Sequence, residues 1–262
     1  MKHTIYKNTS LSFSDQGEGS AVVLLHGFLE NKTMWHYLSP SLTKEHRVIA
    51  IDLLGHGKTE CMGYIHTMED MADSVHHILQ ELQLEKAVFI GHSMGGYVAL
   101  SFAKLYPEMV EGLVLMNSTA REDSIERKNN RDRAIIAVKR NYQAAIGMSI
   151  SNLFNEANRT RLATEIEKAR KEALLTPLQG IIAAQEGMKI RDDNEILLHT
   201  TSFPKMLILG KKDPVLDYEE TKTQVENTDV ELVTFEDGHM SHFENQNELE
   251  KVILYFLKKF SL

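Results

Sequence analysis

Hydrophobic positions along the chain follow two alternating patterns. Short, continuous apolar runs, typical of strands buried on both faces, are separated by longer segments whose apolar residues recur at helical spacing. This alternation predicts an α/β fold with a mostly parallel sheet and helices on both faces. The predicted strands are an antiparallel pair within residues 4–14, followed by 21–25, 47–51, 87–90, 112–116, 206–209 and 230–235. The clearest predicted helices cover 68–82, 98–106 and 249–257.

One long segment, residues 118–200, lacks this alternation. It has no strong strand pattern, and the helical patterns within it cover 121–140, 144–154, 161–175 and 178–188. We therefore predict a core formed by residues 1–117 and 201–262, with 118–200 as a helical insertion. Six basic residues of the insertion are interpreted as a solvent-exposed helix face: Arg127, Lys128, Arg131, Arg133, Lys139 and Arg140.

Composition narrows the possible functions. The chain has 262 residues, and its 42% hydrophobic content is enough for a substantial core. Its net charge of −8 argues against a general nucleic-acid-binding protein. The single cysteine, Cys61, excludes an intrachain disulfide, and no apolar run suits a signal peptide or a membrane span. We therefore expect a cytoplasmic monomer or homodimer that acts on a small molecule.

The strongest chemical motif is Gly91-His92-Ser93-Met94-Gly95. It lies directly between a predicted strand and a predicted helix, which is the context of a nucleophile elbow. In such a turn the serine hydroxyl is exposed, and the glycines remove Cβ atoms that would collide with neighbouring backbone. The helix N-terminus adds free N–H groups and a partial positive charge. The motif predicts that Ser93 is a catalytic nucleophile.

A serine nucleophile requires a general base and a carboxylate that orients this base. Asp213 follows the predicted strand 206–209 and is the expected acid. His239 follows the last predicted strand and is the expected base, whereas His242 is expected to support the site from behind. Asp237 is a weaker rival for the acid, because it is too close to His239 in a tight turn to orient the ring.

The tetrahedral intermediate of acyl transfer needs at least two N–H donors. The backbone N–H groups of Met94, directly after the nucleophile, and of Phe28, in the loop after the strand 21–25, are the expected donors. His26 is expected to brace this loop. Further candidate pocket residues lie near the loop or in the insertion, where they could equally pack the insertion on the core: His26, Leu29, Tyr142, Met148, Phe154, Ile181 and Met188.

Four motifs resemble those of the α/β-hydrolase family, and they occur in the family's order over nearly the whole chain. They are Leu25-His26-Gly27-Phe28, Asp52–Thr59 with Thr59 in place of a serine, Gly91–Gly96, and Gly238-His239 with Glu244. The resemblance implies an eight-stranded sheet, a cap inserted after the sixth strand, and hydrolysis with neither a metal nor an organic cofactor. A serine nucleophile disfavours the haloalkane dehalogenases and epoxide hydrolases of the family, which attack through aspartate.

The expected reaction is hydrolysis of a small or medium carboxylic ester through an acyl-enzyme on Ser93. Alternatives on the same fold are a lyase of the menaquinone pathway, a carbon–carbon bond hydrolase, a thioesterase and a non-enzymatic ligand receptor. The lyase is less favoured because Tyr97 stands where that group typically has an arginine.

Overall fold

A single eight-stranded sheet forms the centre of the computed structural model, which describes residues 1–262. The strands are β1 (Lys2–Tyr6), β2 (Thr9–Gln16), β3 (Ser20–Leu25), β4 (His46–Ile51), β5 (Ala87–His92), β6 (Val110–Met116), β7 (Lys205–Gly210) and β8 (Glu231–Phe235). Their order in the sheet is β1-β2-β4-β3-β5-β6-β7-β8. The β1–β2 and β2–β4 pairs are antiparallel and the other five are parallel, so the predicted fold class is confirmed.

The position of the site follows from this strand order. β3 lies between β4 and β5, so the connections that leave β3 and β5 run to opposite sides of the sheet. Open α/β sheets hold their ligands in the crevice that such a reversal leaves at the carboxyl ends of the strands. The loop that begins at His26 and the turn at Ser93 both start at this edge.

Helices cover both faces of the sheet. Their bounds are α1 (Ser39–Leu42), α2 (Met68–Glu81), α3 (Met94–Leu105), α4 (Ile125–Arg140), α5 (Tyr142–Asn152), α6 (Ala163–Ala173), α7 (Leu178–Lys189), α8 (Glu195–Thr200), α9 (Tyr218–Lys222), α10 (Ser241–Glu244) and α11 (Gln246–Lys259). Short 3-10 turns are η1 (Lys32–His36), η2 (Pro107–Met109), η3 (Glu156–Asn158) and η4 (Thr223–Val225).

The side chains of β3 show why helices must cover both faces of the sheet. Val23 and Leu25 pack with α2 and α3 in one core cluster, whereas Val22 and Leu24 pack with α1 and α11 in the other. Successive strand residues point to opposite faces, so a strand that is apolar at every position is stable only between two helical layers.

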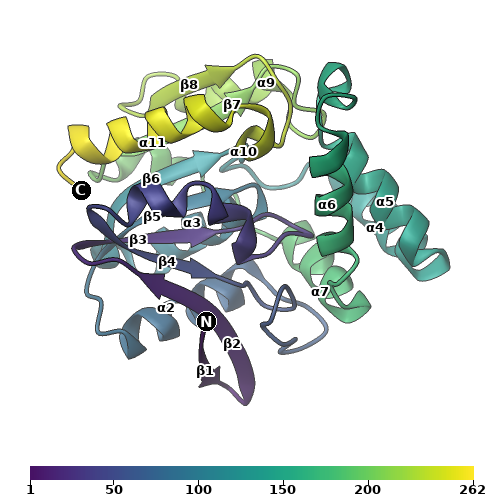
Figure 1. Ribbon diagram of the computed structural model, residues 1–262, viewed down its shortest axis with the longest axis horizontal. Helices are drawn as coiled ribbons and strands as arrows, with labels where there is room; N and C mark the ends of the chain where they lie inside the picture. Colours follow the sequence, from purple (N-terminus) through teal and green to yellow (C-terminus); the bar gives the residue numbers. More distant parts are fainter.

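In the sequence, the four helices α4 to α7 lie between β6 and β7. In space they gather beside the sheet, at the ends of the central strands (Figure 1). α7 is held close to the core: the N–H of His66 donates to the carbonyl of Ala183 at 3.0 Å, and a Cβ at Gly187 would overlap the His66 carbonyl oxygen. Small residues permit such a close approach of two backbones.

The segment after α7 packs differently from the rest of the predicted insertion. α8 packs on α3 and η4, and its Leu198 is buried among α2 and α3 side chains. α7 also places Ala184 and Met188 in this cluster, but it packs mainly on α4. We therefore propose that the inserted domain consists of α4 to α7 and ends before α8. No helix of the structure combines the length and apolarity that crossing a membrane would require.

Candidate active site

Ser93 occupies the turn between β5 and α3, where the motif places it. Its φ of +48° lies in the left-handed region, which is strained for a residue with a side chain. Its N–H donates to the carbonyl of Met116 on β6 at 2.9 Å, which helps to hold the turn. Gly95 allows α3 to start this close to β3, because a Cβ there would overlap the Leu25 carbonyl oxygen.

The structure brings Ser93, His239 and Asp213 into one chain of contacts. Ser93 Oγ lies 2.9 Å from His239 Nε2, and His239 Nδ1 lies 2.7 Å from Asp213 Oδ2. These are the distances at which a histidine can take the serine proton while a carboxylate fixes its tautomer.

The carboxylate of Asp213 is held in its charged form. Its Oδ1 accepts hydrogen bonds from the N–H groups of Val215 and Leu216, at 2.8 and 3.0 Å. Burial opposes ionisation, but His239 and these two donors keep the pKa of Asp213 below its ordinary value.

Asn117 is a further member of the site that the sequence analysis missed. It is fully buried with a φ of +45°, directly after β6. Its Nδ2 donates to Asp213 Oδ2 at 3.2 Å and to the Gly238 carbonyl at 3.1 Å, and its Oδ1 accepts from the Ser241 hydroxyl at 2.6 Å. Asn117 therefore links the acid to the histidine loop, and its place after a central strand was the available signal.

The two expected oxyanion donors remain free for a ligand. The N–H of Phe28 donates to no protein acceptor. Met94 is the first residue of α3, where an N–H has no intrahelical acceptor. The Phe28 side chain lines the cavity beside Ser93, whereas the Met94 side chain is buried in the core cluster.

A buried ionic cluster lies behind the oxyanion loop. Glu30 Oε2 accepts from the Gly27 N–H at 2.9 Å and lies 2.7 Å from His92 Nδ1, while Glu30 Oε1 lies 3.0 Å from His242 Nε2. Burial opposes protonation of His92, but Glu30 raises its pKa above the ordinary value. Burial lowers the pKa of His242, so of the two histidines beside Glu30 the protonated form is favoured at His92.

This cluster places His242 behind the site, where we expected it, and adds Glu30 and His92. His92 Nε2 also lies 3.0 Å from the carbonyl oxygen of His239, so His92 connects Glu30 to the backbone of His239. Glu30, His92 and His242 are a set of side chains whose ligand atoms approach within 4.8 Å of one another, as at a metal site. Metal binding would require His92 to release its proton, which the pairing with Glu30 opposes.

The inserted domain touches the histidine loop directly. The N–H of His239 donates to the Leu153 carbonyl at 3.0 Å. Glu244 accepts from the N–H of Asn155 at 2.8 Å and from the N–H of Gly238 at 3.1 Å. Asp237, the weaker rival for the acid, instead accepts hydrogen bonds from the side chains of Asn155, Asn158 and Asn245.

A cavity of about 110 Å³ lies beside Ser93. It is lined by Phe28, Leu29, Glu30, His92, Ser93, Tyr97, Arg127, Arg131, Ser149, Leu153, Met188, Val215, His239 and Met240. A second, mostly apolar cavity of about 200 Å³ shares Phe28, Leu29 and Ser149 with it. Side chains of α4 and α5 supply most of the lining of this second cavity.

The candidate pocket residues divide between these cavities and the interior. Leu29 and Met188 line the cavity at Ser93, and Met148 and Ile181 line the second one. The other three line neither. His26 accepts a hydrogen bond from the Leu53 N–H at 2.9 Å, the Tyr142 hydroxyl donates to the Leu174 carbonyl at 3.1 Å, and Phe154 packs on Phe243. His26 therefore has the loop-bracing role that we expected, and Tyr142 and Phe154 stabilise the inserted domain.

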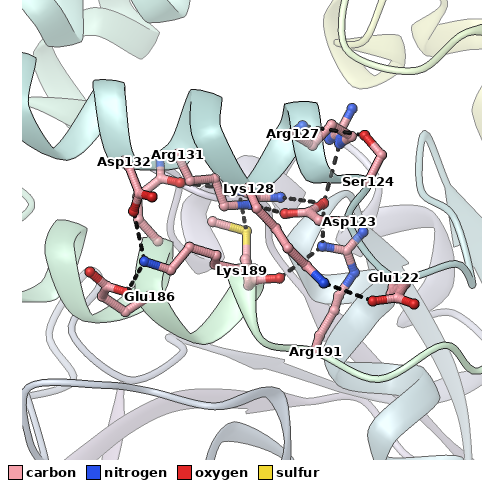
Figure 2. A network of polar contacts seen from close by, with 12 residues as sticks. Glu122, Asp123, Ser124, Arg127, Lys128, Arg131, Asp132, Glu186, Lys189 and Arg191 are labelled. Atoms are coloured by element: carbon pink, nitrogen blue, oxygen red, sulfur yellow. Dashed lines mark hydrogen bonds and ion pairs between the residues drawn. The ribbon is translucent and has the colours of Figure 1, made fainter.

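Our interpretation of the basic residues of α4 as a solvent-exposed face is wrong for two arginines. Arg127 and Arg131 line the cavity at Ser93 and bind Asp123, whose side chain is fully buried, whereas Arg133, Lys139 and Arg140 are exposed. Figure 2 shows Arg127, Arg131 and Arg191 around the single Asp123 carboxylate. Residues four apart share one helix face, so the spacing of Arg127 and Arg131 could have predicted that both point to the same side of α4.

Comparison with known proteins identifies the family. A model of the alpha/beta hydrolase fold matches residues 20–246. The chain belongs to this family. This alpha/beta hydrolase is similar in structure to a malate-bound thermophilic esterase from Thermogutta terrifontis, with a TM-score of 0.90 and 35% identity, over 96% of this chain and 94% of the other.

Two curated relatives have different names. The hydrolase is 30% identical over 245 residues to the dihydrolipoyllysine-residue acetyltransferase component of the acetoin cleaving system from Pseudomonas putida, and the match covers 92% of this chain. This chain spans only 64% of that protein's length. The hydrolase is also 29% identical to a Bacillus subtilis (strain 168) protein provisionally named 2-succinyl-6-hydroxy-2,4-cyclohexadiene-1-carboxylate synthase, and the match covers 97% of each chain.

Proposed function

We propose that this protein is a serine hydrolase that cleaves a small or medium carboxylic ester through an acyl-enzyme on Ser93. The observation that carries the proposal is the run of contacts from Ser93 Oγ through His239 to Asp213, at 2.9 and 2.7 Å, in the wall of a cavity. The esterase from Thermogutta terrifontis, at 35% identity, supports the same reaction class.

The proposed mechanism is acyl transfer to water. Ser93 attacks the ester carbonyl carbon while His239 takes the hydroxyl proton, and Asp213 stabilises the resulting imidazolium. The N–H groups of Phe28 and Met94 stabilise the oxyanion. His239 then protonates the departing alcohol, and a water activated by His239 hydrolyses the acyl-enzyme. In this proposal α4 to α7 act as the cap that shapes the substrate cavity.

A lyase reaction is the second candidate, because the Bacillus subtilis relative named as a synthase matches over 97% of each chain. Both candidates use Ser93, but only the hydrolase forms an acyl-enzyme. Tyr97, which lines the cavity in place of the arginine typical of the lyases, favours the hydrolase. Carbon–carbon bond hydrolysis, thioester hydrolysis and a receptor role remain alternatives that the experiment addresses.

The test combines labelling with a fluorophosphonate probe and a panel of 4-nitrophenyl esters, thioesters and vinylogous 1,5-diketones. We expect labelling of the wild type, loss of labelling in Ser93→Ala, and hydrolysis of short esters that falls by about 10⁴-fold or more in that variant. Folded wild type that resists the probe and hydrolyses no ester would refute the proposal and favour a receptor. Faster turnover of the thioesters or diketones would replace the ester by that substrate class.

A further inference from the structure

We propose that Arg127 and Arg131 form a subsite for an ionised carboxylate carried by the substrate, so that the preferred ester has a second, anionic end. This inference rests on the proposed function, because it concerns the substrate of the same cavity. Arg127 and Arg131 both line the cavity at Ser93.

The arginine cluster contains more positive charge than its partner can neutralise. Arg127, Arg131 and Arg191 all donate to Asp123, the one carboxylate between them (Figure 2). Asp123 is fully buried, so its single charge lies within the cluster and not at the cavity surface. Arg127 and Arg191 also line a separate hollow that contains Glu122, Asp193, Asp217 and Glu220, but none of these four acids lines the cavity at Ser93. On the side of this cavity, the positive charge of Arg127 and Arg131 therefore has no acidic partner besides Asp123.

Donor groups of the cluster also remain unused. Arg127 donates only from Nε, to Asp123, and from Nη1, to the Val215 carbonyl. A guanidinium has five N–H donors in a planar fork, so three of those of Arg127 have no protein acceptor. Carboxylates match this fork, and their charge-assisted hydrogen bonds are the strong ones.

Glu30 in the cavity wall and Asp213 beside His239 are already engaged. Glu30 is the only acidic residue in the cavity wall, and its carboxylate is bound by His92 and by the Gly27 N–H. Asp213 is bound by His239 and by two backbone N–H groups. Neither carboxylate forms a hydrogen bond with Arg127 or Arg131.

The two arginines lie at the mouth of the site. An open hollow of about 320 Å³ shares Arg127, Arg131 and Val215 with the cavity at Ser93, and no acidic residue lines this hollow. The apolar cavity shares Phe28 and Leu29 with the cavity at Ser93, but neither arginine lines it. An ester held at Ser93 can thus place an apolar group in the apolar cavity and an anion at the mouth.

The experiment compares two esters of equal length, the 4-nitrophenyl monoester of adipic acid and 4-nitrophenyl hexanoate. We expect the wild type to show a higher kcat/KM for the adipate monoester. In Arg127→Gln and in Arg131→Gln the ratio of kcat/KM for the adipate monoester to kcat/KM for the hexanoate should fall by about 10- to 100-fold, the usual effect of losing hydrogen bonds to a charged group. Arg133→Gln, an exposed position on the same helix, should leave the ratio of the two values unchanged.

A second variant avoids the risk of misfolding. Gln185 accepts a hydrogen bond from Arg131 Nη1 at 3.1 Å, so Gln185→Glu keeps this contact and adds a negative charge at the mouth. It should lower the preference for the adipate monoester by about tenfold. A wild type that prefers the hexanoate, or arginine variants that slow both esters equally, would overturn the subsite while leaving the esterase proposal intact.

A binding measurement separates the two proposals if neither ester is hydrolysed. Adipate should bind to Ser93→Ala in a calorimetric titration, and should bind at least tenfold more weakly when Arg127→Gln is added. Equal binding in the two proteins, or no binding, would refute the subsite whatever the reaction is.

Discussion

Glu30 Oε2 lies 2.7 Å from His92 Nδ1, and this contact joins the oxyanion loop to the nucleophile turn across 62 positions of sequence. The same oxygen accepts the N–H of Gly27, directly before Phe28, and His92 directly precedes Ser93. One carboxylate, only 9% exposed, thus positions both the predicted oxyanion donor and the predicted nucleophile. Such second-layer contacts decide whether a site keeps its productive geometry.

The Glu30–His92 pair should give the protein a pH-dependent stability. The pKa of Glu30 is lowered from 4.5, so its contribution is present above pH 4.5 and is lost as pH falls through the lowered value. The pKa of His92 is raised from 6.5, so its contribution is present below pH 6.5 and is lost as pH rises through the raised value.

The variant that tests this pair is Glu30→Gln. We expect a loss of about 3 kcal/mol in unfolding free energy within the window from pH 4.5 to 6.5, and a smaller loss near pH 9. Urea unfolding at both pH values measures the difference. The exposed Glu85→Gln should show no such dependence, and an equal loss for Glu30→Gln at both pH values would contradict the ion pair.

Asp213→Asn should lower kcat by about 10³- to 10⁴-fold with little change in KM, because an amide leaves the His239 tautomer unsuited to accept the serine proton. Asp237→Asn is the matched control, since Asp237 contacts three asparagines and not the His239 ring. Steady-state kinetics on the best ester compares the two variants. A greater loss in Asp237→Asn would transfer the role of the acid to that residue.

Glu244→Ala should loosen the histidine loop and the inserted domain together. The substitution leaves the N–H groups of Asn155 and Gly238 without their acceptor, at a cost of about 1–3 kcal/mol for each buried donor. We expect a lower free energy of unfolding and a lower kcat. Calorimetry and kinetics would contradict this role if Glu244→Ala behaved like Glu248→Ala, a substitution at an exposed position nearby.

Glycines on two helices allow a test of how α7 meets the core. At Gly187 an added Cβ would overlap the His66 carbonyl oxygen, so Gly187→Ala should destabilise the protein by about 1–3 kcal/mol. At Gly147 of α5 the nearest atom to an added Cβ is Arg170 Cδ, at 3.5 Å, so Gly147→Ala should stabilise the helix by about 0.5–1 kcal/mol. Thermal unfolding measures both, and an unchanged Gly187→Ala would mean that α7 can move off the core.

Predictions from the sequence were most accurate where the pattern of apolar residues is local and uninterrupted. The strand and helix periodicities around Ser93 are complete within about twenty residues, so β5, the turn and α3 were predictable as a unit. Asp213 and His239 were likewise placed by the strands that precede them. The helices α4 to α7 were predicted within a few residues. The predicted insertion also included α8, which we propose to assign to the core, because a short amphipathic helix does not reveal which surface it packs against.

Other parts of the site depend on contacts between distant residues, which no local pattern contains. Asn117 and Asp213 are 96 positions apart, and Glu30 meets His92 only because β3 and β5 are neighbours in the sheet. Likewise, the basic residues of α4 look alike in the sequence, but packing of the helix against α7 turns Arg127 and Arg131 inward and leaves Arg133 in solvent. Local periodicity is thus enough to predict the nucleophile and the sheet that carries it, but the charge of the substrate cavity arises only when the inserted helices fold over the strand ends.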